Sequence, residues 1–116
     1  MNNLDISNSV FSEKDITDAI GQCEISEYNV SRSCNGLDVL EIGVIDMYKN
    51  RHIIVLRNMG SKISKEKIYV DIIDSRKTRN RVIKELHTEH NLTQQFLAKY
   101  FNLSQSTISI IVNNKI

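Results

Sequence analysis

The clearest pattern of apolar and polar positions lies near the C-terminus, in residues 94–113. The apolar positions follow a helical spacing, but its phase changes near Asn102, which one continuous helix would not require. Asn adopts left-handed backbone at low cost, so Asn102 can form a sharp turn. Ala98 offers the small side chain that a close helix crossing needs. The pattern predicts two short helices joined by a turn, with an apolar seam formed by Leu97, Phe101, Leu103, Ile108 and Ile111.

Capping residues support two separate helix starts in this segment. Thr93 precedes the first helix and Ser104 precedes the second, and both residue types favour the N-cap position. Residues 75–90 upstream carry an apolar stripe that can cover the other two helices, formed by Val82, Ile83 and Leu86. The expected C-terminal domain, residues 74–116, is therefore a three-helix unit with a helix-turn-helix.

The N-terminal half, residues 1–73, is predicted to be a small α+β module with one helix and a three-stranded antiparallel sheet. Ser12 can cap a helix over residues 12–20, with Asp15 as its capping-box partner, and Gly21 can end it. Runs rich in β-branched residues predict the strands, and residues 58–66 around Gly60 predict a loop. The expected strands are 37–45, 52–56 and 67–73.

The string Leu92-Thr-Gln-Gln-Phe-Leu-Ala-Lys-Tyr-Phe-Asn-Leu-Ser-Gln-Ser-Thr-Ile-Ser-Ile-Ile-Val-Asn-Asn-Lys115, within residues 79–115, resembles the DNA-binding core of the Cro/repressor (XRE-like) transcription regulators. The resemblance covers the C-terminal third of the chain. That family continues with two further helices, whereas this sequence ends at Ile116. A three-helix ending after a separate N-terminal domain is more similar to Mor-like phage activators and Trp-repressor-type folds. The resemblance implies double-stranded DNA as the partner.

Base contacts are expected from the second helix of a helix-turn-helix, which enters the major groove while the first helix crosses the backbone. A glutamine can pair with adenine, and an exposed isoleucine suits a thymine methyl group. The resemblance also implies Thr107 as a phosphate or base-edge contact. The alternative interpretation of the polar positions is a solvated helix surface. The residues that point away from the seam are Gln105, Ser106, Ser109, Ile110 and Asn113.

Phosphate contacts are expected at helix starts, where free backbone N–H groups favour anions. The basic run before residue 82 is a second source, because cations at a helix start oppose the helix dipole unless an anion binds there. Arg79 and Arg81 belong to this run, and they are favoured as phosphate contacts over Lys99, which lies in a later helix. A charged linker between two domains is the alternative. The complete predicted set is Arg79, Arg81, Thr93, Gln94, Ser104 and Lys115.

Charge is distributed unevenly along the 116 residues, although the net charge is only +1. Residues 1–60 carry five basic and nine acidic side chains, a net charge of −4, whereas residues 61–116 carry ten basic and five acidic ones, a net charge of +5. The positive half contains the predicted helix-turn-helix. Such an asymmetry would attract DNA to one end of the molecule, although charge also varies by chance along short chains.

Other classes of protein find little support in the sequence. No apolar run approaches the roughly 20 residues of a membrane span, and the start of the chain does not resemble a signal peptide, so a cytoplasmic location is expected. Cys23 and Cys34 are then expected to be reduced. His87 and His90 lack further ligands at a suitable spacing, so we expect neither a metal site nor a cofactor. No nucleophile-and-base arrangement is visible, and an enzyme is not expected.

These observations predict a sequence-specific transcriptional regulator that acts as a homodimer on an inverted-repeat operator. Dimerisation is expected because a second copy can cover a face of the small sheet, although helix 12–20 alone is the alternative cover. A competing hypothesis is a DNA-tethering interaction protein, such as an antitoxin-like or mobile-element maintenance adaptor. In that case the N-terminal half would bind another protein.

Overall fold

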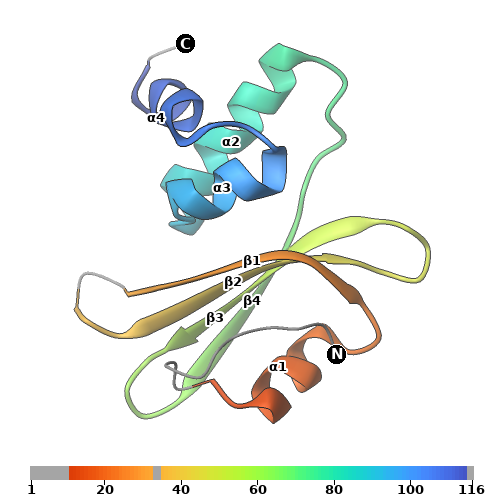
Figure 1. Ribbon diagram of the computed structural model, residues 1–116, viewed down its shortest axis with the longest axis vertical. Helices are drawn as coiled ribbons and strands as arrows, with labels where there is room; N and C mark the ends of the chain where they lie inside the picture. Colours follow the sequence, from red (N-terminus) through yellow and green to blue (C-terminus); the bar gives the residue numbers. More distant parts are fainter. Residues whose placement is uncertain (1–10, 33–34, 115–116) are drawn as a thin grey trace. The chain divides into compact units, whose positions relative to one another are not determined.

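The computed structural model describes residues 11–32 and 35–114, and the chain divides into two compact units, residues 1–69 and 70–116. The first unit holds helix α1 (Glu13–Ile20) and strands β1 (Glu24–Arg32), β2 (Asp38–Ile45), β3 (Arg51–Asn58) and β4 (Ile63–Tyr69) (Figure 1). The second holds helices α2 (Arg76–His90), α3 (Gln94–Phe101) and α4 (Gln105–Asn113). The predicted α+β fold class is confirmed.

The sheet has four strands in the order β1-β2-β3-β4, with every neighbouring pair antiparallel. The predicted number of three strands was therefore wrong, because β1 was missed. A register shift between Ile25 and Glu27 explains this. The bulge brings Ile25, Tyr28 and Val30 opposite Val44, Ile42 and Leu40, on one face of the sheet. It thereby breaks the strict alternation by which a half-buried strand is recognised in a sequence.

Strand β4 begins and ends earlier than the predicted strand 67–73, and its first residues lie in the predicted loop 58–66. Its exposed lysines are Lys65, in the predicted loop, and Lys67, in the predicted strand. They alternate with less exposed residues on an edge strand, where lysine is a common outward-facing residue. Pairing stops near Tyr69 because its partner His52 is only the second residue of β3. The strands predicted over 37–45 and 52–56 correspond to β2 and β3.

Helix α1 lies against one face of the sheet and forms the core of the first unit (Figure 1). Its start is fixed by the predicted capping box. Asp15 N–H donates to Ser12 Oγ at 3.0 Å, and Ser12 N–H donates to Asp15 Oδ2 at 2.9 Å. Gly21 ends the helix with φ of 59°, a backbone conformation that glycine adopts without strain. The core consists of Phe11, Ile16, Ala19, Ile20, Leu40, Ile42, Val44, Ile54 and Leu56.

The core of the second unit is made by the three helices and one linker residue, Leu92. The apolar stripe predicted on α2 is buried, as are Leu97, Ile108 and Ile111 of the predicted seam, whereas Phe101 and Leu103 are half-buried. A tight core therefore fixes which sides of α3 and α4 remain accessible. Its buried residues are Val82, Ile83, Leu86, Leu92, Phe96, Leu97, Ala98, Tyr100, Ile108, Ile111 and Val112.

Candidate nucleic-acid interface

A three-residue turn, residues 102–104, joins α3 to α4, and its geometry follows from Asn102. Asn102 has left-handed backbone, with φ of 55° and ψ of 50°, as predicted. The N–H of Leu103 donates to the carbonyl oxygen of Ala98 at 2.9 Å, and the N–H of Asn102 donates to that of Lys99 at 3.3 Å. This is the Schellman arrangement, which satisfies the last carbonyl groups of a helix and reverses the chain. Ala98 is buried beside the turn.

Helix α4 starts at the predicted N-cap. The N–H of Thr107 donates to Ser104 Oγ at 3.1 Å, and the hydroxyl groups of the two residues lie 2.9 Å apart. The Thr107 hydroxyl is therefore engaged with the cap, and the side chain is half-buried at the margin of the helix surface. Of the six α4 residues assigned to DNA contact, Thr107 is the least accessible by position.

The other five predicted residues of α4 share one surface, which we call the α4 face: Gln105, Ser106, Ser109, Ile110 and Asn113. At 100° per residue they fall within an arc of about 140°. All are exposed except Ser109, which is half-buried and accepts a hydrogen bond from Asn113 Nδ2 at 3.2 Å. Ile110 is 59% exposed, whereas its neighbour Ile111 is only 5% exposed. The α4 face is thus polar apart from one outward-facing isoleucine.

The start of α3 adds two of the predicted phosphate contacts. Thr93 Oγ1 accepts a hydrogen bond from Phe96 N–H at 3.2 Å, so Thr93 is the N-cap. Thr93 and Gln94 are both half-buried. The preceding linker is also held in place, because Asn91 is left-handed and His87 Nδ1 lies 2.9 Å from the carbonyl oxygen of Leu92. Both helices therefore begin at defined positions.

The two predicted arginines of α2 are held by neighbouring side chains. Arg79 is half-buried and donates to Asn80 Oδ1 at 2.9 and 3.2 Å. Arg81 lies 2.9 Å from Glu85 and 3.7 Å from Asp71. These contacts partly occupy both guanidinium groups. Lys115 lies outside the described residues.

A groove of about 800 Å³ runs along α2 and reaches α4 at Ile111. Its lining includes Lys84 and Thr88, which the sequence analysis did not select. The signal that could have identified them is their spacing with Lys77 and Arg81, since residues 77, 81, 84 and 88 recur on one helix face. We refer to this surface as the α2 groove, lined by Arg76, Lys77, Thr78, Asn80, Arg81, Lys84, Glu85, Thr88 and Ile111.

Three further findings concern the chemistry of the described residues. Within 11–32 and 35–114, no group of three or more His, Cys, Asp or Glu side chains is arranged to hold a metal ion. Cys23 is a free thiol there, whereas Cys34 lies outside the described residues. In the same part of the chain, no helix has both the length and the apolar character that crossing a membrane requires.

Comparison of the chain with protein-family models, with curated proteins and with solved structures finds no match.

Proposed function

We propose that this protein is a sequence-specific regulator of transcription that binds duplex DNA through a helix-turn-helix made by α3 and α4. The observation that carries the proposal is the composition of the α4 face. Polar side chains with donors and acceptors surround one exposed isoleucine on a helix whose opposite side is fully packed. A base-reading helix can place such an isoleucine against a thymine methyl group, and the polar side chains around it can bond to base edges.

Within this proposal α4 enters the major groove with Gln105 and Ser106 nearest to the bases. We expect the starts of α3 and α4, which are capped by Thr93 and Ser104, to face the phosphates, where backbone N–H groups favour anions. Arg79 and Arg81 add positive charge to the same unit. Residues 70–116 carry seven basic and four acidic side chains, which favours association with a polyanion.

The proposal is tested by selecting duplexes from a random library with the full-length protein and measuring affinity by fluorescence anisotropy. Gln105→Ala should weaken binding to the selected duplex by ~1–3 kcal/mol and leave binding to random DNA nearly unchanged, because a base contact supplies discrimination and phosphate contacts supply general affinity. Gln22→Ala, at an exposed glutamine of the first unit, is the matched control and should change neither. A wild-type protein that binds no duplex better than random DNA would refute the proposal.

We further propose that the protein acts as a homodimer through the first unit. Two half-sites about one helical turn apart require two α4 helices related by a two-fold axis. Strands β1 and β4 form the edges of the sheet, where a second copy can add strands. Full-length protein should sediment as a dimer and bind its best duplex with two chains per site. A monomer that binds one-to-one would contradict the dimer and the inverted-repeat operator together.

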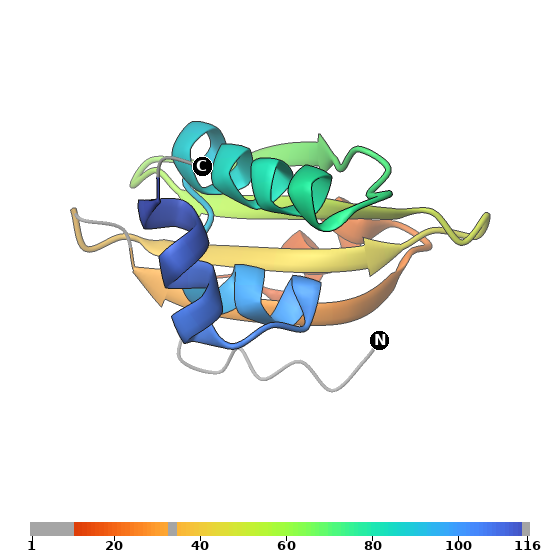
Figure 2. The same cartoon turned by 90° about the horizontal axis from the view of Figure 1, so that it is seen from above.

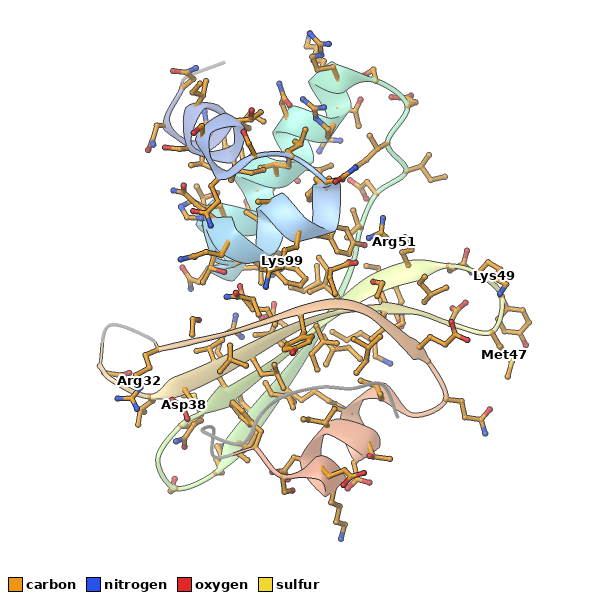
Figure 3. All side chains as sticks on the ribbon, in the orientation of Figure 1. Arg32, Asp38, Met47, Lys49, Arg51 and Lys99 are labelled. Carbon is orange, nitrogen blue, oxygen red and sulfur yellow. The ribbon has the colours of Figure 1, made fainter. Side chains whose placement is uncertain are left out.

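The second candidate function, a DNA-tethered interaction protein, is favoured by the turn between β2 and β3. Met47 and Tyr48 are 66% and 76% exposed at its tip, and Figure 3 shows Met47 and Lys49 at the outer end of this hairpin. Asp46 Oδ1 accepts hydrogen bonds from the N–H groups of Tyr48 and Asn50, at 2.8 and 2.9 Å, so the tip is ordered. Ordered, exposed Met and Tyr side chains are typical of protein-binding surfaces.

Co-purification distinguishes the two candidates. A stoichiometric protein partner that is lost with the double variant Met47→Ser, Tyr48→Ser would support the interaction protein. Unchanged operator binding by that variant, with no partner recovered from wild-type protein, would favour the autonomous regulator.

A further inference from the structure

The α2 groove lies beside α4 but is a different surface from the α4 face. Its lining consists of residues of α2 and of Ile111 of α4. The two helices that carry it, α2 and α4, lie next to each other (Figure 2). Lys84 Nζ donates to the backbone carbonyl oxygen of Asn114, just after the end of α4. This bond keeps the C-terminal end of α4 next to the middle of α2.

Charge in the α2 groove is mainly positive. Its lining contains four cationic side chains, Arg76, Lys77, Arg81 and Lys84, and one carboxylate, Glu85. Arg76 and Lys77 are exposed, and neither forms an ion pair with any residue that the structure describes. The hydroxyl groups of Thr78 and Thr88 already donate hydrogen bonds, to Asp74 Oδ1 at 2.9 Å and to the carbonyl oxygen of Lys84 at 2.8 Å, so these threonines add no free donors. An anionic partner is therefore the chemically matched one.

The shape of the α2 groove favours an extended polyanion over a small anion. Its α2 residues run from Arg76 to Thr88, which corresponds to about 18 Å of helix. The four cations lie between Arg76 and Lys84, which corresponds to about 12 Å of this length. One strand of duplex DNA carries a phosphate about every 3.4 Å of helix axis, so 18 Å corresponds to about five phosphates.

The α2 groove adjoins the α4 face, because Ile110 belongs to the α4 face and Ile111 to the groove. Successive residues of a helix point about 100° apart, so the two surfaces meet at an edge of α4. A backbone strand that flanks the major groove beside Ile110 would continue toward the cations of α2.

We propose that the α2 groove binds the sugar–phosphate backbone of the same DNA whose bases contact the α4 face. This inference rests on the proposed function and adds a contact surface to it. Glu85 acts against the contact, because its carboxylate holds Arg81 at 2.9 Å and competes with phosphate for the guanidinium group. The groove thus contains a cation that becomes available when a phosphate displaces Glu85.

Two substitutions of opposite sign test this surface in the full-length protein. Lys77→Gln removes an exposed cation that has no ion-pair partner among the described residues, and it should weaken selected and random duplexes equally. The slope of log affinity against log salt concentration should fall in magnitude by about one, as for the loss of one phosphate contact. Glu85→Gln should tighten binding to both duplexes, since it removes the carboxylate from the groove and leaves Arg81 with its longer ion pair, 3.7 Å to Asp71.

Matched controls separate local contacts from net charge. Lys14→Gln, on α1, makes the same charge change as Lys77→Gln, and Glu89→Gln makes the same change as Glu85→Gln from an exposed position of α2 outside the groove lining. Each groove variant should change affinity and salt slope more than its control. Thermal melting of all four variants checks that the fold is retained.

The outcomes distinguish this inference from the proposed function. Groove variants that change affinity and salt slope no more than their controls would overturn the backbone contact. In that case, a loss of affinity with Gln105→Ala for the selected duplex alone would still support the proposed function. Wild-type protein that binds no duplex would overturn both. Equal anisotropy responses to sodium phosphate and to duplex in displacement titrations would identify a small-anion site and would also overturn the backbone contact.

Discussion

Ile110 and Ile111 are neighbours on α4. Replacing each of them in turn by Ala tests both the orientation of the helix and its role in DNA binding. Ile110 is 59% exposed and Ile111 is 5% exposed, so replacing each by Ala should have opposite consequences for stability and DNA binding. Ile111→Ala removes three buried carbons at ~0.8 kcal/mol each, or about 2.4 kcal/mol before any cavity cost. Because Ile111 also lines the open α2 groove, we expect a total of about 2–3 kcal/mol, near the lower end of such substitutions.

For Ile110→Ala the same calculation applies to the buried two-fifths of the side chain and gives about 1 kcal/mol at most. The higher helix propensity of Ala offsets part of this loss. Stability of the second unit should therefore stay within about 1 kcal/mol of wild type. Urea unfolding followed through amide hydrogen exchange of α2–α4 residues measures the two variants without contributions from the first unit.

DNA binding, unlike stability, should depend on the Ile110 side chain. If its side chain contacts a thymine methyl group, replacing that thymine by deoxyuridine should weaken wild-type binding by ~1 kcal/mol, or about fivefold. The same DNA change should have no effect on Ile110→Ala, because the methyl group has lost its partner, and the double-mutant cycle measures this coupling. Equal stability losses for the two variants would refute the orientation of α4. A deoxyuridine effect that is the same in wild type and Ile110→Ala at every thymine would refute the methyl contact.

Two further predictions concern the fold. Ala98→Leu should destabilise the second unit by ~1–3 kcal/mol and reduce DNA affinity, because the added volume overpacks a buried position beside the turn; an unchanged melting temperature and affinity would show that Ala98 is not at a helix crossing. His52 is 4% exposed with both ring nitrogens unpaired among the described residues, and burial, reinforced by Lys67 and opposed by Asp46, lowers its pKa below 6.5. The His52 imidazole therefore binds a proton at a higher pH in the unfolded chain than in the folded protein. Its contribution to the free energy of unfolding is complete above about pH 6.5 and decreases as the pH falls from there to the folded-state pKa. Urea unfolding from pH 5 to 8 should show that the free energy of unfolding falls less toward low pH in His52→Gln than in wild type. Identical pH profiles of the two proteins would contradict this prediction.

The sequence by itself determined the local features of the second unit. Caps at Thr93 and Ser104, the left-handed Asn102 and the separation of Ile110 from Ile111 all depend on residues at most a few positions apart. Helix periodicity and side-chain capping act over this range, so the pattern of the chain specifies them before any tertiary contact forms. The same holds for the capping box at Ser12.

Tertiary structure decided the features that depend on distant partners. Strand β1 owes its place to pairing with β2 across a bulge, and β4 ends at Tyr69, whose partner His52 is one residue from the start of β3, so neither boundary is specified by its own segment. The ion pair of Arg81 with Asp71 and the bond from Lys84 to the end of α4 join residues 10 and 30 positions apart, whereas the pair of Arg81 with Glu85 follows from their i,i+4 spacing on α2. Charge patterns identify a basic segment, but the fold decides which cations line a groove and which meet partners from other segments, because such contacts depend on distance in space.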